Sequence, residues 1–235
     1  MNAIPKKIHL IYKTHHIPKE YENFLESIQL HHPEWEITVY DDAEARAIVL
    51  NHMPDLLEIY DQYSLNVQRT DLFRIIVVYL FGGFYLDLDM LCFKSLNPLC
   101  QHKLVLGEEK KLTPEECLKL GLTHPVRIAN YMFGSIPRHA FWLELIHGIR
   151  EYSRIEIRNE DDVLNSTGPG LLTNVYHDLK ETYQDITLIP NHHKLCMRSC
   201  SANSCHFGDY AAHFHLGKWR WESGPAPAST LKANQ

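Results

Sequence analysis

Two carboxylates stand two residues apart, at Asp87 and Asp89, after an aromatic and apolar run that follows the glycine pair Gly82-Gly83. Strand side chains alternate between two faces, so we expect a strand over 84–89 with both carboxylates on one face. Two anions on one face repel each other unless a cation or a ligand lies between them. Such oxygen ligands suit Mg²⁺ or Mn²⁺, which commonly bridge carboxylates to substrate phosphates. The pair therefore indicates metal-dependent chemistry on a diphosphate.

A second pair of charges, Asp71 and Arg74, precedes these carboxylates in a predicted helix over 66–81. The two residues are three positions apart and so are neighbours on the helix surface. The rest of this helix is dense in apolar side chains, so the charges should either reach solvent or find partners. In a functional interpretation, Asp71 accepts a ribose or sugar hydroxyl and Arg74 supports the sugar or the carboxylates. A plain helix salt bridge remains the alternative.

The rest of the chain alternates between predicted strands and helices. Strands are expected over 7–12, 35–40, 84–89, 103–107 and 187–190. Helices are expected over 20–31, 54–60, 66–81 and 138–152. Three further helices are expected: one from an N-cap at 41–42 to residue 50, one that begins near residue 113, and one that begins within 166–170 and ends at 179. Gly82 stands where a left-handed C-terminal cap would end a helix. This alternation favours an α/β fold, with one domain over 1–224 and a disordered tail over 225–235.

The composition is that of an ordinary soluble enzyme. Of 235 residues, 45% are hydrophobic and 22% charged, and the net charge of −6 disfavours nucleic acid as a partner. The longest apolar run, over 75–81, is too short to cross a bilayer, and the N-terminus lacks the apolar core of a secretory signal. Six cysteines then favour free thiols in a reducing compartment. We therefore expect a cytoplasmic protein, with peripheral contact at the inner membrane or secretion as an effector left open.

Four segments together resemble a known family. They run in order from 8 to 13, from 33 to 42, from 69 to 74 and from 82 to 89, and the last contains Asp87-Leu88-Asp89. This order is similar to that of the DXD-motif glycosyltransferases of the capsular-polysaccharide and initiating α-1,6-mannosyltransferase group, the family 32-like enzymes. A more distant similarity links it to the clostridial glucosylating toxins. The match is dense over about the first 95 residues.

The resemblance implies a single-domain, Rossmann-like GT-A fold with a mixed central sheet. It also implies a divalent metal, Mn²⁺ or Mg²⁺, a UDP- or GDP-sugar donor and transfer with retention to a glycan, lipid-linked sugar or protein. The residues that it assigns to the nucleotide and sugar are Ile11, Tyr12, Asp71, Arg74, Tyr85 and Asp87. Asp87 would bind ribose and metal, and Asp89 would be the direct metal ligand. Asp87, Asp89 and Arg74 would form the catalytic group.

The C-terminal third adds further candidates. Gly168 lies in a Thr-Gly-Pro-Gly segment that could present backbone amides to a sugar, or could be a plain turn and N-cap. In the family, a late His and Trp close over the diphosphate, which makes His213 a candidate metal or phosphate ligand and Trp219 a candidate lid residue. The family's usual Ser-Trp is here Lys218-Trp219. Asn130 is either a sugar-pocket residue or a satisfied core amide.

Other functions are also consistent with parts of this pattern. Cys196, Cys200 and Cys205 invite a zinc site, but their spacing lacks the paired knuckles of a structural site, so a loop with free or buried thiols is the alternative. Paired aspartates also occur in metal-dependent phosphohydrolases. A non-catalytic module that binds sugar nucleotides is a third class. Incubation with sugar nucleotides and Mn²⁺ would distinguish the three classes. Release of nucleoside diphosphate indicates a glycosyltransferase, release of inorganic phosphate indicates a phosphohydrolase, and release of neither indicates a binding module.

Overall fold

The computed structural model describes residues 3–119, 123–191 and 205–216. Within these ranges, the α-helices are α1 (Glu22–His31), α2 (Asp42–His52), α3 (Leu57–Gln62), α4 (Asn66–Phe81), α5 (Pro114–Lys119), α6 (Phe141–Tyr152), α7 (Glu160–Ser166) and α8 (Pro169–Leu179). The strands are β1 (Lys7–Ile11), β2 (Glu36–Tyr40), β3 (Gly83–Leu86), β4 (Met90–Cys92), β5 (Leu104–Lys111), β6 (Val126–Ile128), β7 (Met132–Ser135), β8 (Ile186–Ile189), β9 (His206–Phe207) and β10 (Ala211–His213). Short 3-10 turns occupy 19–21, 54–56 and 97–101.

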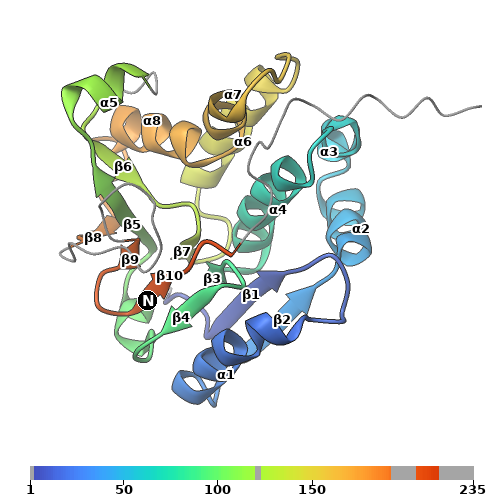
Figure 1. The fold of residues 1–235 in the computed structure, drawn as a ribbon, viewed down its shortest axis with the longest axis vertical. Coiled ribbons are helices and arrows are strands. Elements are labelled where there is room, and N and C mark those ends of the chain that lie inside the picture. The colour runs from blue at the N-terminus through green and yellow to red at the C-terminus, as the bar shows by residue number, and fades with distance from the viewer. Residues whose placement is uncertain (1–2, 120–122, 192–204, 217–235) are drawn as a thin grey trace, which may run out of the picture.

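A mixed seven-stranded sheet forms the centre of the molecule (Figure 1). Its order is β2-β1-β3-β7-β5-β6, and β8 pairs with β5. β1 is parallel to both β2 and β3, whereas β7 is antiparallel to β3 and to β5. Because β1 and β3 are parallel, their carboxyl ends lie at the same edge of the sheet, where β7 begins. This edge carries Asp87.

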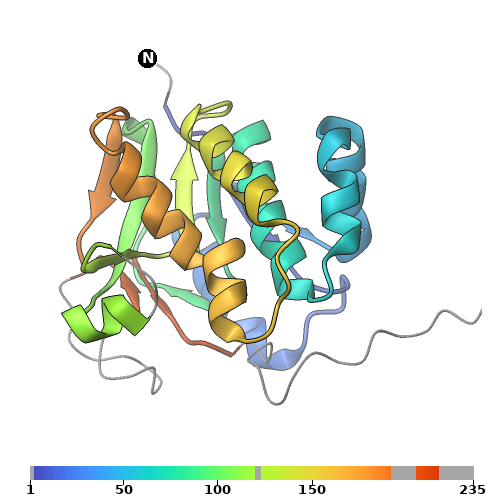
Figure 2. The same cartoon turned by 90° about the horizontal axis from the view of Figure 1, so that it is seen from above.

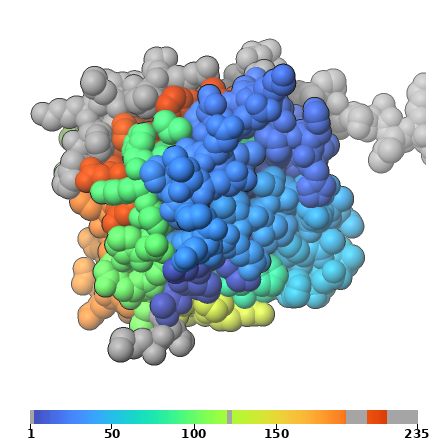
Figure 3. Space-filling view, turned by 90° about the horizontal axis from the view of Figure 1, so that it is seen from below, coloured from blue at the N-terminus to red at the C-terminus, as the bar shows by residue number. Residues whose placement is uncertain are grey.

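Two hydrophobic cores cover the two faces of the sheet. One joins the sheet to α2, α3, α4, α6 and α8, which gather on one side (Figures 1 and 2). The other joins it to α1 and to a small sheet of order β4-β10-β9. Figure 3 shows N-terminal residues, in blue, at the centre of one surface with residues from the middle of the chain, in green, beside them. The protein is thus layered, with α1 and the small sheet opposite the main group of helices.

α4 lies between several elements and is buried almost all round, from Asp71 through Leu80. A helix that is apolar on every side belongs in a core. Its predicted bounds, 66–81, are confirmed. Gly82 follows with φ 65° and ψ −170°, so the positive φ of a left-handed cap is confirmed, whereas ψ lies outside the left-handed helical region. The N-cap at Asp41 is also confirmed. Its side chain accepts a hydrogen bond from the backbone N–H of Glu44, and the Glu44 side chain accepts one from the backbone N–H of Asp41.

Several elements depart from the sequence prediction, β3, α7 and β7 among them. β3 ends at Leu86, so the expected strand over 84–89 is wrong beyond that residue. α7 and β7 were not predicted. The first has few apolar residues, and the second is a four-residue run too short to show a period. The division into a domain over 1–224 and a tail over 225–235 stays a prediction, because the tail lies outside the described residues. No helix in the described ranges is long and apolar enough to cross a membrane.

Candidate active site

The two carboxylates lie in a turn that directly follows β3. The backbone N–H of Met90 donates to the carbonyl of Asp87 at 3.1 Å, which closes the turn, and the N–H of Asp87 donates to the carbonyl of Tyr131 at 2.8 Å. The carboxylates therefore converge because the chain turns back on itself, and not because a strand alternates. Leu86 and Leu88 both enter the core on the side of α1 and the small sheet.

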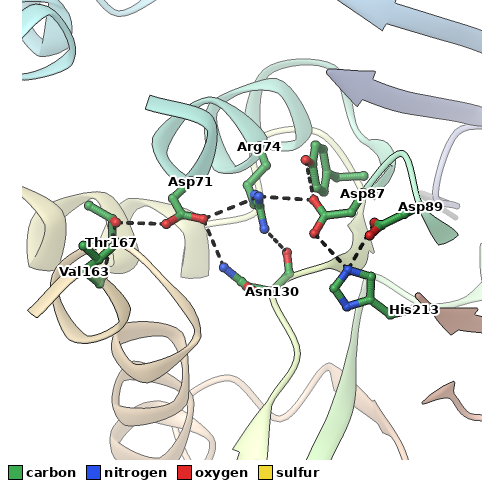
Figure 4. Close-up of polar contacts among 9 residues, drawn as sticks. Asp71, Arg74, Asp87, Asp89, Asn130, Val163, Thr167 and His213 are labelled. Atoms are coloured by element: carbon green, nitrogen blue, oxygen red, sulfur yellow. Dashed lines mark hydrogen bonds and ion pairs between the residues drawn. The ribbon is translucent and has the colours of Figure 1, made fainter. Parts of the chain in front are cut away.

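His213 completes a cluster with the two carboxylates, which we call the Asp–His cluster (Asp87, Asp89 and His213). β10 pairs with β4, which places His213 opposite Met90 and next to the turn. Its Nε2 lies 3.1 Å from Asp89 Oδ1 and 3.7 Å from Asp87 Oδ2 (Figure 4). One ligand atom from each of the three residues lies within 4.8 Å of the other two. The structure thus brings together the three predicted metal ligands.

Asp89 is the more deeply buried of the two carboxylates, with 5% of the residue exposed. The Leu216 N–H donates to its Oδ2 at 2.5 Å, and the Phe214 N–H donates to its carbonyl at 3.1 Å. Burial favours a higher pKa for Asp89, but the bonds and charge from His213, with the Leu216 amide, lower it. Burial favours a lower pKa for His213, but Asp89 and Asp87 raise it. Both charged forms are therefore favoured in the cluster.

Asp87 divides its two oxygens between two neighbourhoods. Its Oδ1 accepts from the Tyr85 hydroxyl at 2.7 Å and lies 3.2 Å from Arg74 Nη2, whereas its Oδ2 faces His213 (Figure 4). The Arg74 guanidinium also lies over the Tyr85 ring, 4.8 Å from its centroid. Asp87 is thereby held in one orientation, with one oxygen turned toward the cluster.

Arg74 links this carboxylate to a second group, the α4 network (Asp71, Arg74, Asn130 and Thr167). Arg74 Nη1 donates to the Asn130 carbonyl at 2.7 Å, and its Nη2 lies 3.5 Å from Asp71 Oδ1. Asp71 also accepts from the Asn130 side chain at 3.1 Å and from the Thr167 hydroxyl at 2.9 Å. Figure 4 shows the two groups side by side, joined by Arg74.

Burial determines the charge balance of this network. It raises the pKa of Asp71 to about 6, against the opposing effects of Arg74 and Thr167. Burial alone would lower the pKa of Arg74, but Asp87, Tyr85 and Asp71 together raise it above its ordinary value, so the guanidinium stays charged. The helix salt bridge considered from the sequence is present, and it is part of a larger buried network. Asn130 is both a satisfied amide and a direct neighbour of Asp71.

The residues of the Asp–His cluster fit a divalent cation. Two carboxylates and an imidazole are a donor set suited to Mn²⁺ and, through the carboxylates, to Mg²⁺. Among the described residues, the charges of three carboxylates (Asp71, Asp87 and Asp89) exceed those of Arg74 and protonated His213, and a cation that displaces the His213 proton would balance the remaining negative charge. The His213 Nδ1 atom is buried without a hydrogen-bond partner in the described part of the chain, and its ring packs against those of Tyr131 and His215, with centroids 4.6 Å and 4.0 Å away.

The other predicted residues fall at the same edge or outside the described ranges. Ile11 ends β1, and Tyr12 follows it with its ring 5.5 Å from that of Tyr21. Gly168 is the N-cap of α8, directly after Thr167, so both the turn and the helix start are present. Trp219 and Lys218 lie outside the described residues, as do Cys196 and Cys200 of the considered zinc site. Cys205 is buried.

The sequence did not reveal that Thr167 and Asn130 both bond to Asp71. Thr167 is 96 residues from Asp71 and Asn130 is 59, so no local pattern links them. The sequence indicates Thr167 as part of a turn, and Asn130 as a sugar-pocket residue or a satisfied core amide. Their shared partner becomes apparent only in the tertiary structure.

Part of the chain is similar to a known protein family. Residues 18–106 match the family described as glycosyltransferase sugar-binding region containing DXD motif. The DXD motif is Asp87-Leu88-Asp89, and the resemblance expected from the four ordered segments is confirmed.

Two relatives and one solved structure illustrate the similarity. Inositol phosphoceramide mannosyltransferase 3 of Schizosaccharomyces pombe is 29% identical over 74% of this chain and 45% of its own length. An uncharacterized glycosyltransferase of Acanthamoeba polyphaga mimivirus is 27% identical over 92% of this chain and 84% of its own. The PaToxG glycosyltransferase structure superposes with a TM-score of 0.52, at 15% identity, over 75% of this chain and 70% of its own. The fold is therefore of the expected GT-A type.

The match covers only part of the length of the fungal relatives. The chain spans 43% to 51% of the length of the first curated proteins that it matches. The printed names of these relatives describe mannosyl transfer to inositol phosphoceramide, which is a property of those proteins.

Proposed function

We propose that this protein is a metal-dependent glycosyltransferase. It moves a sugar from a nucleotide-diphosphate donor, a UDP- or GDP-sugar, to a hydroxyl acceptor on a glycan, lipid-linked sugar or protein, with retention of anomeric configuration. The observation that carries the proposal is the Asp–His cluster, in which a DXD pair and a histidine from the far end of the chain meet within 4.8 Å.

Asp87, Asp89 and His213 would hold Mn²⁺ or Mg²⁺. The bound cation supplies Lewis-acid stabilisation of the charge that builds on the leaving diphosphate. Tyr85 and Arg74 keep Asp87 in position, since both contact its Oδ1. The chain therefore prepares the carboxylates before any donor arrives, which is how an enzyme avoids reorganisation during the reaction.

The α4 network lies beside this centre and would bind the sugar or ribose of the donor. Asp71 is 2% exposed, and each of its oxygens already accepts one hydrogen bond. A carboxylate oxygen has two lone pairs, so Asp71 keeps acceptor capacity for a hydroxyl. Ile11 and Tyr12 lie at the end of β1, where an aromatic face would stack on the base, and Gly168 and Trp219 would approach from the C-terminal side.

In the reaction, the acceptor hydroxyl forms a bond to the anomeric carbon on the face from which the diphosphate departs. The carbon–oxygen bond to the diphosphate breaks, and a departing phosphate oxygen takes the hydroxyl proton. All three carboxylates of the site are engaged by named partners, and none is assigned the role of nucleophile. Transfer on one face therefore needs no covalent sugar–enzyme intermediate.

A donor screen tests this function. The chain is incubated with UDP- and GDP-sugars, GDP-mannose included, in the presence of Mn²⁺ or of EDTA. Nucleoside diphosphate is expected to be released in the presence of Mn²⁺ and not in the presence of EDTA. Release of inorganic phosphate would instead indicate a phosphohydrolase, and neither product would indicate a binding module. A thermal-shift series with the same donors measures binding, since ligand at 100 times its Kd stabilises the native state by about 2.7 kcal/mol.

The place of action is part of the same proposal. We infer a cytoplasmic enzyme that makes peripheral membrane contact if its acceptor is lipid-linked. Fractionation of cells that express the chain, in low and high salt, would separate a peripheral protein from one that is free in solution.

A further inference from the structure

A buried ion pair, Glu109 and Arg127, lies on the hairpin of β5 and β6 and has no role in the function proposed above. Arg127 Nε is 2.9 Å from Glu109 Oε2, and the two side chains are only 9% and 15% exposed. A buried ion pair is weak evidence for stability, because desolvation offsets most of its attraction. Its presence in this hairpin therefore calls for another explanation.

The pair points to the side of the sheet on which His213 lies. Ile128 enters the core on the helical side, so the preceding residue of β6, Arg127, faces the opposite side. The ladder between β5 and β6 shifts register between Glu108 and Lys110, and Glu109 lies at that shift. Bulges of this kind re-aim a side chain and are common next to active sites. β5 also packs against β9, since a Cβ built at Gly107 would lie 2.5 Å from the Phe207 ring, and β9 pairs with β10, which carries His213.

Three polar atoms on this side are buried without a hydrogen-bond partner in the described residues. They are Glu109 Oε2, Arg127 Nε and His213 Nδ1. The two charges of the pair are close, but they are not aligned as a hydrogen bond. Buried polar atoms are satisfied in the great majority of native structures, so these three atoms indicate a polar ligand or water beside the pair.

The chemistry of the pair identifies the ligand class. A carboxylate accepts hydrogen bonds and a guanidinium donates them, so together they match neighbouring hydroxyls, each of which does both. The charges of the pair cancel, which suits a neutral ligand. We propose that Glu109 and Arg127 form the acceptor subsite and hold a neutral, polyhydroxylated ring, a sugar or a cyclitol, next to the donor. This inference rests on the proposed glycosyltransferase function.

Saturation-transfer NMR tests the subsite without requiring turnover. The probes are myo-inositol, methyl α-mannopyranoside and methyl β-glucopyranoside, each added to the full chain with Mg²⁺ and with UDP or GDP. The test variant is Glu109→Gln/Arg127→Gln, which removes both charges together and leaves neither one buried alone. The matched control is Lys7→Gln/Glu36→Gln, which removes an exposed inter-strand pair at the same 2.9 Å.

At least one probe is expected to bind the parental and control chains and to bind the test variant at least about tenfold more weakly, since the variant loses both charged hydrogen-bond partners of the hydroxyls. Equal binding to the test variant overturns the subsite, as does the absence of binding by all three probes.

Donor thermal shifts are recorded on the same samples. Their absence in the parental chain contradicts the proposed function itself, whereas normal donor shifts with unchanged probe binding contradict only the subsite. If the double variant does not fold, Glu109→Asp, which shortens the carboxylate, replaces it under the same criteria.

Discussion

The α4 network and the Asp–His cluster lie side by side but are stabilised in different ways. In the network, Asp71 is matched by Arg74, Asn130 and Thr167, so its charge is satisfied within the protein. In the cluster, two carboxylates share the contacts of one imidazole, and Asp87 must also share Arg74 with Asp71. The charges of the network are matched within the protein, whereas the cluster retains negative charge, which a cation would balance under the proposed function. The network therefore stabilises the fold beside the donor site, and the cluster would hold the metal.

The largest effect is expected from breaking the cluster with Asp89→Asn. Loss of this carboxylate removes a direct ligand of the proposed cation, so Mn²⁺-dependent release of nucleoside diphosphate should fall on the order of 10⁴-fold, which corresponds to about 5 kcal/mol in the barrier. The fold should be retained, because the amide still accepts the Leu216 N–H. Donor turnover is measured with the exposed Asp178→Asn as control. Turnover at the parental rate in Asp89→Asn would show that the metal site is wrongly assigned.

Arg74→Met breaks the network and tests the other half of the comparison. The change leaves Asp71 and Asp87 without their shared cation, and removal of one partner from a buried pair costs about 3 to 4 kcal/mol. The free energy of unfolding in urea should fall by that amount. Arg150→Met removes an exposed pair with Asp55, for which a change below about 1 kcal/mol is expected. Similar small effects for both variants would contradict the structural role of Arg74.

His9 extends the comparison to the strand that leads into the cluster. Its Nε2 lies 2.8 Å from the Gly82 carbonyl, and its Nδ1 lies 3.1 Å from the Tyr40 hydroxyl. Burial lowers the pKa of His9 from 6.5 to about 4. Between these values the unfolded chain binds a proton that the native chain does not, so stability falls as the pH falls, by about 3 kcal/mol between pH 7 and pH 4.

Urea unfolding at a series of pH values measures this effect. His9→Asn cannot take up the proton, so its free energy of unfolding should decline less steeply than that of the parental chain over this window. The His52→Asn variant, which changes an exposed histidine, is the control. Parallel curves for the parental chain and His9→Asn would show that His9 is not held neutral.

The smallest effect is expected from Thr167→Val, which removes a single bond from the network. Asp71 keeps Arg74 and Asn130, so the loss should be about 1 kcal/mol of unfolding free energy. Because the Thr167 hydroxyl lowers the pKa of Asp71, its removal should raise that pKa further. Chemical denaturation measures the first effect, and Thr14→Val, which changes an exposed threonine, is its control. A loss above about 3 kcal/mol would mean that the network is less redundant than its contacts indicate.

Local sequence patterns were sufficient to predict many of the helices and strands. The helix at 66–81 was predicted with its exact bounds because its apolar run is long and a glycine ends it. The capping residue Asp41 and the strands at 7–11 and 36–40 follow from equally local signals. The strand through Asp89 failed because apolar and acidic residues alternate in this turn as they would in a strand. A period of two over six residues does not distinguish these conformations.

The sequence by itself determined the chemistry that this protein can offer: the DXD pair, the helix charges before it and a late histidine, all in family order. Only the tertiary structure decided which of these groups meet. The pairing of β10 with β4 brings His213 to the turn, and the corner before α8 brings Thr167 to Asp71. These contacts join residues about 100 positions apart, where no helical or strand period extends. Burial then sets their charges, because desolvation depends on the packed neighbours and not on the residue type.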